Sequence, residues 1–380
     1  MITLLVTDRN LNVLGDPITQ WTDIDITLRF NEPDSGSVAL PTGVLSPAQL
    51  APGNRLVVIR DGAYFTAGPI ETPGALSWSV RGGDSGPGTT TLTFASDLAS
   101  IVAEVAYPDP ARAITAQTVA RRTFTNANAE AVMRQLVTEN VGPAALAARR
   151  IPGLSLGAVA GVGSAVTFGF RLDQLGDALR AVALAGGGLG FRTRWTGTGI
   201  TFEVYQPRDL RAQVRYSRGL GNLRGYEFDP AAPTATVAIV GATGEAANRA
   251  FSEFVSPAAA TWGRMVTVVD QRTAEDPAEI VQAGAEALAQ GAESARLTAD
   301  TVDTATQRYG THYGLGDLVS IELNNGVELA DIVRAVNLKA TPATGEVVTS
   351  TIGTQSASVD PDWVRLLRDL ARRLGRLEAI

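Results

Sequence analysis

Two β-prone runs separated by only two residues restrict the fold of this chain more than any other feature. Arg55–Arg60 and Ala63–Ala67 flank Asp61-Gly62. Asp-Gly favours a type I′ hairpin turn because both central residues need a positive φ. Apolar residues also alternate with polar ones over residues 24–30, the period of a half-buried strand, and residues 89–94 form another β-prone run. The first hundred residues therefore predict a small barrel or sandwich of short strands.

Two helices are predicted in the middle of the chain. Apolar residues recur at helical spacing over residues 129–141 and 172–185. Gly142-Pro143 follows the first run and Gly186 to Gly188 follow the second, and both are typical helix ends. Two strands are predicted next, at residues 189–195 and 200–205.

A third helix is marked at its start. Asp276 is a suitable N-cap, Pro277 a suitable first helical residue and Glu279 a capping-box partner, which predicts a helix over residues 276–295. A hairpin and a last strand are expected after it, at residues 318–323, 327–336 and 346–352. The 39 glycines and 19 prolines agree with a mainly β chain containing an α+β insert.

The C-terminal segment carries a heptad pattern. Trp363, Leu370 and Leu377 recur every seven residues, and Leu367 and Leu374 interleave with them. A single amphipathic helix that docks on its own domain needs the same stripe. Residues 353–360 before it are small and polar and are expected to be a linker. A linker favours an intersubunit role for the amphipathic helix over residues 361–380.

Composition excludes several classes of function. There are no cysteines, which excludes disulfides, thiolate metal sites and a cysteine nucleophile. The net charge of −7 lacks the excess of cations that a duplex-binding protein needs. We find neither an apolar run long enough for a membrane span nor a signal peptide, so the chain is expected to be made in a cytoplasm. Lys339 is the one lysine among 32 basic residues, a bias typical of a GC-rich genome.

One hydrolase-like motif is present. Gly153-Leu154-Ser155-Leu156-Gly157 matches G-x-S-x-G, but that elbow needs a strand before the serine and a helix after it. Neither flank fits: residues 149–152 are Arg-Arg-Ile-Pro and residues 158–164 are small. His312, the sole histidine, would be the base; a turn residue is the simpler interpretation. The sequence therefore favours a chain that is not an enzyme.

Other candidate sites are weaker still. Lys339 lacks the glycines of a phosphate-binding loop, and the glycine-rich residues 161–163 and 186–190 are expected to be turns. Pairs such as Asp23/Asp25 and Asp300/Asp303 would suit calcium or glycosidic acid–base chemistry, although solvated faces are the simpler interpretation. No cofactor or metal site is predicted. A cell-wall glycan hydrolase stays open as an alternative.

Three aromatic residues suggest another alternative. Trp195, Tyr205 and Trp262, if exposed, would suit a carbohydrate- or receptor-binding module. We expect them in cores instead.

Short motifs along nearly the whole chain resemble those of the minor tail, or tail-hub, proteins of siphophages that infect high-GC Gram-positive bacteria. In chain order the motifs are Phe30-Asn31-Glu32-Pro33, Ser35-Gly36-Ser37, Arg60-Asp61-Gly62, Tyr107-Pro108-Asp109-Pro110-Ala111, Glu139-Asn140-Val141-Gly142-Pro143-Ala144, Arg149, Gly221-Asn222-Leu223, Trp262-Gly263-Arg264, Asp270-Gln271-Arg272 and Tyr313-Gly314-Leu315-Gly316-Asp317-Leu318-Val319.

The resemblance implies a domain order. Two β-barrel tube-type domains are expected at residues 1–105 and 191–352, the second with the packing helix 276–295. A helical or mixed insert at 106–190 separates them, and the linker 353–360 and helix 361–380 follow. A wall-degrading extension is not expected after the short helix.

The resemblance also implies a role and partners. Such hubs are homotrimers whose six barrels match a hexameric tail ring. They close the distal tail tube, meet the tape-measure protein, anchor receptor-binding or fibre proteins and let DNA pass without specific binding. The chain is therefore expected in the virion at the distal end of the tail, and in the host cytoplasm during assembly. We also predict a net negative pore-facing surface.

Overall fold

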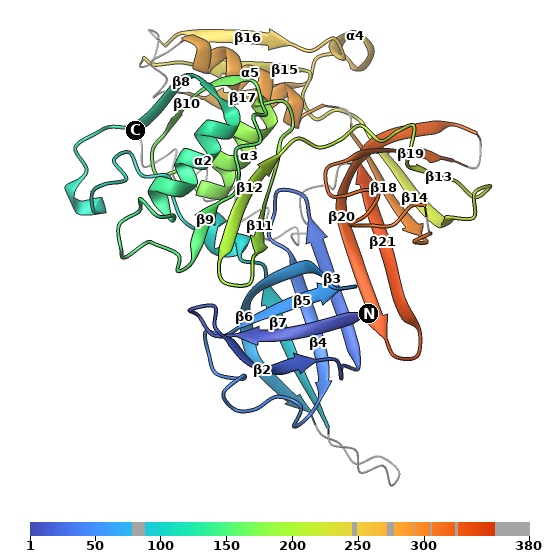
Figure 1. The fold of residues 1–380 in the computed structure, drawn as a ribbon. Coiled ribbons are helices and arrows are strands. Elements are labelled where there is room, and N and C mark those ends of the chain that lie inside the picture. The colour runs from blue at the N-terminus through green and yellow to red at the C-terminus, as the bar shows by residue number, and fades with distance from the viewer. Residues whose placement is uncertain are drawn as a thin grey trace.

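The computed structural model describes residues 1–77, 88–244, 249–271, 277–292, 294–304, 306–323 and 326–353. Strands dominate this part of the chain, which confirms the mainly β prediction, and helices gather in the middle of the sequence (Figure 1). None of the helices in these ranges is long and apolar enough to span a membrane.

The first β unit contains the predicted hairpin. Asp61 and Gly62 have φ angles of 52° and 78°, so both central turn residues are left-handed as predicted. In the predicted alternating strand, Ile24, Ile26 and Leu28 are buried. The elements are β1 (Ile2–Thr7), β2 (Val13–Ile18), β3 (Asp23–Arg29), β4 (Ser35–Pro41), β5 (Arg55–Arg60), β6 (Ala63–Ser77), β7 (Thr89–Ala95) and α1 (Leu98–Val102).

The insert packs two helices against small sheets. Both predicted helices are confirmed, but the second begins at Leu175 instead of residue 172, because Leu172 is left-handed with a φ of 60°. Strands β11 and β12 pair with each other and with β9, and their side chains belong to the core of the insert. The elements are η1 (Ile114–Ala116), β8 (Arg122–Asn128), α2 (Ala129–Asn140), β9 (Leu154–Leu156), β10 (Ala165–Phe170), α3 (Leu175–Ala185), β11 (Gly190–Trp195) and β12 (Ile200–Tyr205).

The last part of the chain completes the sheet of the first unit. The predicted hairpin and final strand are present, although residues 324–325 of the hairpin turn lie outside the described ranges. The elements are β13 (Arg215–Tyr216), β14 (Leu223–Ala231), β18 (Ser294–Thr301), β19 (Leu318–Glu322), β20 (Glu328–Thr341) and β21 (Gly345–Gly353).

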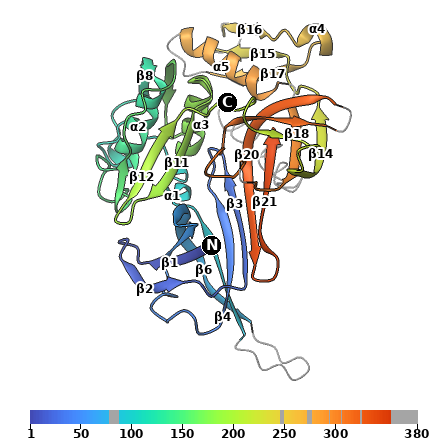
Figure 2. The same cartoon turned by 45° about the vertical axis from the view of Figure 1, so that its right-hand side comes forward.

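One 13-stranded sheet replaces the two separate barrels that were expected. Its order is β14-β18-β21-β20-β3-β4-β7-β6-β5-β1-β2, with β13 and β19 attached beside β20. Among the described residues no pairing joins β2 to β14, so the sheet closes no barrel. The length of β20 explains the continuity, because its first residues pair with β19 while Ala335 to Ala340 pair with β3. Both views place the blue strand β3 beside the red β20 (Figures 1 and 2).

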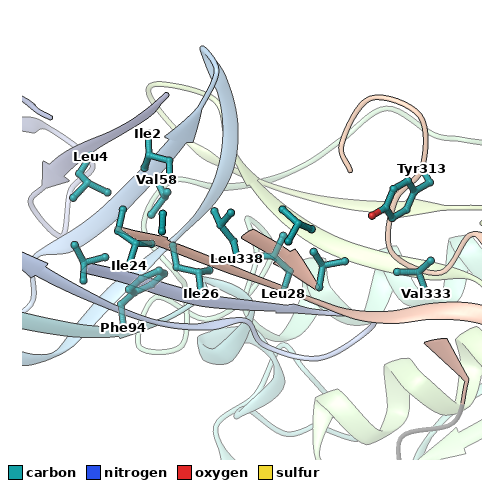
Figure 3. Packing of buried hydrophobic residues seen from close by; sticks show 14 of the residues in the cluster. Ile2, Leu4, Ile24, Ile26, Leu28, Val58, Phe94, Tyr313, Val333 and Leu338 are labelled. Atoms are coloured by element: carbon teal, nitrogen blue, oxygen red, sulfur yellow. The ribbon is translucent and has the colours of Figure 1, made fainter. Parts of the chain in front are cut away.

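The two halves of this sheet also share one core (Figure 3). Ile26 of β3 lies opposite Leu338 of β20, and both side chains are fully buried. Phe94 of the first half and Val333 of the second belong to the same cluster. Burial of this size across the seam makes independent motion of the halves unfavourable.

A small α/β unit, which the sequence did not predict, lies on the side of the insert opposite the first β unit (Figure 1). Its three strands order as β16-β15-β17, with α5 packed on one face. The helix begins at Pro277, as predicted, but it ends at Gln290 instead of residue 295, because the chain enters β18 at Ser294. Asp276 lies outside the described residues. The elements are β15 (Val237–Gly241), β16 (Phe251–Val255), α4 (Ala259–Trp262), β17 (Val266–Asp270) and α5 (Pro277–Gln290).

Candidate functional site

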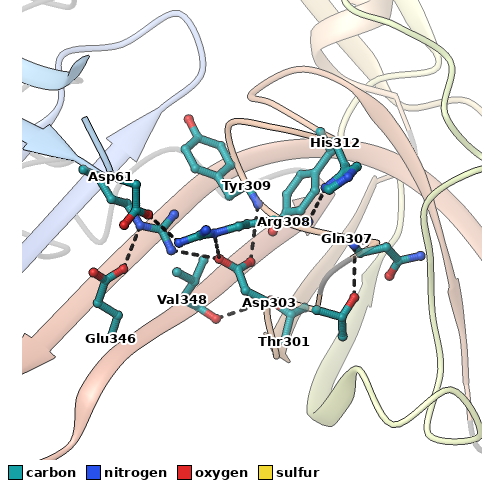
Figure 4. A network of polar contacts seen from close by, with 12 residues as sticks. Asp61, Thr301, Asp303, Gln307, Arg308, Tyr309, His312, Glu346 and Val348 are labelled. Atoms are coloured by element: carbon teal, nitrogen blue, oxygen red, sulfur yellow. Dashed lines mark hydrogen bonds and ion pairs between the residues drawn. The ribbon is translucent and has the colours of Figure 1, made fainter. Parts of the chain in front are cut away.

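A charged cluster, here called the junction network, ties the two halves of the sheet together (Figure 4). Arg60 of β5 is 7% exposed, and its Nη2 donates to Asp303 Oδ2 at 2.9 Å. Its Nε donates to Glu346 Oε2 at 2.8 Å. Arg308 pairs with Asp61 in the hairpin turn. Residues from the first unit thus bind charges from the last quarter of the chain.

The Arg60 guanidinium of the junction network stays charged. Burial alone would lower the pKa of the Arg60 guanidinium, but hydrogen bonds from Arg60 to Asp303 and Glu346 outweigh that effect and raise it. A guanidinium held charged between two carboxylates does not exchange a proton near neutral pH. The network therefore positions segments of the chain.

A row of aromatic rings runs beside the network. Phe65 of β6 meets Tyr309 edge to face with ring centroids 6.2 Å apart, and Tyr309 meets Tyr313 at 5.7 Å. Tyr313 then meets Tyr216 of β13 at 6.0 Å, and its hydroxyl lies 3.2 Å from Ser350 Oγ. Burial raises the pKa of Tyr309 and of Tyr313, so both stay neutral. This row joins the same two halves through packing.

Asn31 joins the sheet to the insert. Its side chain is 9% exposed, with Nδ2 donating to the Leu189 carbonyl and Oδ1 accepting from the Phe191 N–H, each at 2.8 Å. Two such bonds reproduce the pairing of a neighbouring strand. The φ of 58° at Asn31 suits asparagine, which tolerates the left-handed region better than most residues.

A buried carboxylate fixes the adjoining loop. Asp317 is 3% exposed; its Oδ1 accepts from the Arg208 N–H at 2.8 Å and its Oδ2 from the Gly314 N–H at 2.9 Å. The Tyr205 hydroxyl donates to the Leu315 carbonyl at 3.1 Å. The end of β12, the loop before β19 and the end of β3 therefore meet at one place.

A cavity of about 440 Å³ lies between these segments. Asp34 lines it, and burial raises the pKa of that carboxyl to about 6. Its oxygens accept from the Arg29 N–H at 3.0 Å and from Thr66 Oγ1 at 2.8 Å. Within the described ranges no three acidic or histidine side chains group as metal ligands do. The arrangement suits a rigid polar joint between three parts of the fold.

A family model matches residues 3–354, which covers most of the chain. The chain belongs to the Siphovirus ReqiPepy6 Gp37-like protein family. This confirms the siphophage resemblance at the level of the family. No curated protein matches the chain.

Solved structures show that this family member has the fold of tail proteins. The 43 kDa tail protein of prophage MuSo2 from Shewanella oneidensis matches with a TM-score of 0.59 and 12% identity over 92% of this chain and 98% of that one. The tail protein from Neisseria meningitidis matches with a TM-score of 0.59 and 15% identity, over 93% of this chain and 97% of that one. Prophage tail protein gp18 from Listeria monocytogenes matches with a TM-score of 0.56 and 15% identity, over 98% of this chain and 99% of that one.

The G-x-S-x-G motif of this family member lacks the context of a hydrolase elbow. Ser155 lies in β9, and an irregular segment follows it where a helix would be needed. Its Oγ donates to the Ile200 carbonyl at 3.3 Å. His312 lies in the segment between β18 and β19, where its Nδ1 accepts a hydrogen bond from the Arg308 N–H at 3.0 Å. Both side chains therefore make structural hydrogen bonds with the backbone.

One residue of each predicted acid pair, Asp25 and Asp303, makes structural contacts. Asp25 lies opposite Lys339 on neighbouring strands, with Oδ2 3.3 Å from Nζ, and also accepts from Asn337. Asp303 belongs to the junction network, whereas the side chain of Asp300 lies outside the description. Residues 161–163 and 186–189 fall in connecting segments, and Gly190 begins β11.

The three aromatic candidates differ in exposure. Tyr205 is half-buried, with the Arg192 guanidinium 4.8 Å from its ring centroid, and Trp195 is also half-buried. Trp262 is 41% exposed in α4, which departs from the expectation of a core residue. The C-terminal stripe from Trp363 to Leu377 lies outside the described residues.

Sequence reasoning did not assign roles to the residues that make the joint. Asn31 and Asp317 each fall in a motif of the resemblance, Phe30 to Pro33 and Tyr313 to Val319, and that position was the available signal. Asn31 binds Leu189 and Asp317 binds Arg208, each more than 100 residues away, so the motifs alone do not reveal these contacts.

Proposed function

We propose that this chain is a non-catalytic structural subunit of a siphophage tail tip, which closes the distal end of the tail tube as a homotrimer. The observation that carries this proposal is a fold shared with three tail proteins over at least 92% of this chain and 97% of theirs. Membership of a siphovirus family supports the same origin.

The continuous sheet supports a wall-forming role. Its two halves meet at the β3–β20 pair, and the junction network and the aromatic row hold them in one orientation. Three subunits with two β modules each offer six units to a hexameric tail ring. A rigid joint between the modules would preserve that match while the tail assembles.

The proposed partners follow from this position. They are the distal tail-tube ring, the tape-measure protein inside it, and receptor-binding or fibre proteins at the tip. DNA would pass without specific binding, in agreement with the net charge of −7, and the pore-facing surface is expected to be net negative. The location is the virion, after assembly in the host cytoplasm. The proposed host is a high-GC Gram-positive bacterium, as the resemblance implies; the arginine bias agrees with a GC-rich genome.

The C-terminal stripe is the proposed oligomerisation segment. Its members are Trp363, Leu367, Leu370, Leu374 and Leu377, which would lie on one face of a helix. Light scattering tests the homotrimer: a mass three times the 39.7 kDa of one chain is expected. A monomer under tail-assembly conditions would contradict it.

A further inference from the structure

The outer face of the small sheet is largely apolar, and its two edge strands, β16 and β17, expose their side chains there, whereas Val237 on the central strand is fully buried. In register, one row across the sheet is Val255–Val237–Val266 and the next is Glu253–Ile239–Val268. Much of the apolar area on the edge strands is open to solvent: Phe251 is 60% exposed, Val255 56%, Val266 48% and Val268 63%. A contiguous patch of this kind on a soluble protein marks an interaction surface.

The opposite face of this sheet is already covered. Ile280 and Ala283 of α5 pack there with Val240, and Phe254 lies so close to Gly284 that a Cβ at that glycine would come within 2.2 Å of the ring. Helix α5 also contacts the insert, through a buried ion pair between Glu279 and Arg121. The outer face therefore points away from the insert, on the side of the small sheet opposite α5 (Figure 2).

Charged pairs border the apolar patch. Arg264 pairs with Glu253, and Arg249 pairs with Asp270 and lies with its guanidinium 5.4 Å from the Phe251 ring centroid. A partner for this surface would combine an apolar stripe with flanking charges of both signs.

The chain supplies such a partner beyond β21. Residues 361–380 combine the apolar stripe with five arginines and three acidic residues, whereas the whole chain carries −7. A helix over residues 361–377 would be about 25 Å long, enough to cross a three-stranded sheet whose five-residue strands are about 17 Å long. The segment therefore matches the face in length and chemistry.

The described chain also ends close to this unit. Gly353 pairs with Arg296 in β18, and β18 begins four residues after α5 ends. Seven linker residues, 354–360, span about 25 Å when extended. That reach lets the segment leave its own subunit beside the sheet and extend to an adjacent one.

We propose that the C-terminal helix of one copy covers the outer face of the small sheet of the next copy. This inference rests on the proposed homotrimer, since a closed ring needs two unlike surfaces that fit each other, and the stripe and the face are such a pair. Each subunit then gives one helix and receives one.

Cysteine cross-linking tests this contact cleanly because the native chain has no cysteine. Chains carrying Val268→Cys are mixed with chains carrying Leu370→Cys, allowed to assemble, and oxidised with diamide. A disulfide-linked pair of the two different chains is expected on a non-reducing gel, since only side chains a few ångströms apart can be bridged. The matched control is Val281→Cys, at a valine 56% exposed on α5, which should give at least tenfold less product with Leu370→Cys.

Each other outcome overturns a distinct part of the proposal. Trimers by light scattering without the mixed disulfide would retain the homotrimer and reject this contact. Monomers without cross-links would reject both. A double variant, Val268→Cys with Leu370→Cys, is oxidised in parallel; absence of the mixed product together with a disulfide inside single chains of this double variant would show that each copy covers its own sheet. Leu370→Cys chains that link to one another in place of the mixed product would show a helical bundle.

Discussion

Arg60 and Asp303 lie 243 residues apart in the sequence, yet their Nη2 and Oδ2 atoms are 2.9 Å apart in the fold. Their contact places the hairpin of the first unit on the strands that end the sheet. Replacing Arg60 by alanine removes this bond and the one to Glu346 and leaves two adjacent carboxylates. We expect a loss of about 3 kcal/mol in the free energy of unfolding, measured by denaturant titration.

Arg211→Ala is the control for that variant. Arg211 also pairs with an aspartate, Asp209, but both side chains are 54% exposed. A solvent-exposed ion pair contributes little to stability, so this variant should unfold close to the native midpoint. Equal losses in the two variants would contradict the structural role of Arg60.

Asn31 should be sensitive to two kinds of substitution. Asn31→Ala removes both bonds to the insert and places alanine at a φ of 58°, and we expect a loss of about 2–4 kcal/mol. Asn31→Gly removes the bonds and tolerates the φ, so it should lose about 1 kcal/mol less. Denaturation of both variants separates the two causes. Equal stability of Asn31→Ala and the native chain would show that these bonds contribute nothing.

Asp34 should make stability depend on pH. Its pKa is raised from 3.8 to about 6 in the fold, so the folded state binds this proton more tightly than the unfolded state. The free energy of unfolding should therefore fall as pH rises from 4 to 6, and that loss is fully present above pH 6. Asp34→Asn lacks this titration, and the difference between the two chains should change by about 1–2 kcal/mol between pH 4 and 7, discounted for partial solvent contact. Parallel curves would refute the pKa assignment.

Local patterns predicted much of the fold because the forces that set them are local. The Asp61-Gly62 turn depends on two adjacent φ angles, and the start of α5 depends on Pro277. Both follow from a few neighbouring residues. Burial along β3 likewise follows from alternation.

Long-range pairing explains what the sequence did not predict. The link between β3 and β20 joins Ile26 to Leu338, and no local pattern states which strand is the partner of an alternating one. The same limit applies to the junction network, since the sequence pairs Asp303 only with the neighbouring Asp300, whereas its partner Arg60 lies 243 residues away. Exposed and partly buried residues do alternate along β16 and β17. Each strand has only five residues, however, which is too short a run to identify a strand from the sequence.

Deletion of residues 362–380 should separate folding from assembly. The described sheet and insert lie before this segment, so the truncated chain should keep the far-ultraviolet circular dichroism of its strands. Loss of the proposed stripe should lower the oligomeric mass by light scattering. Normal trimers of the truncated chain would rule out the C-terminal segment as the oligomerisation element.

Electron microscopy of the assembled tail tip tests the central proposal most directly. The account predicts density for three copies of this chain around the tube axis, next to the last tail-tube ring, with the two halves of each sheet side by side in the wall. Density for one copy attached to the side of the tail, away from the axis, would contradict it.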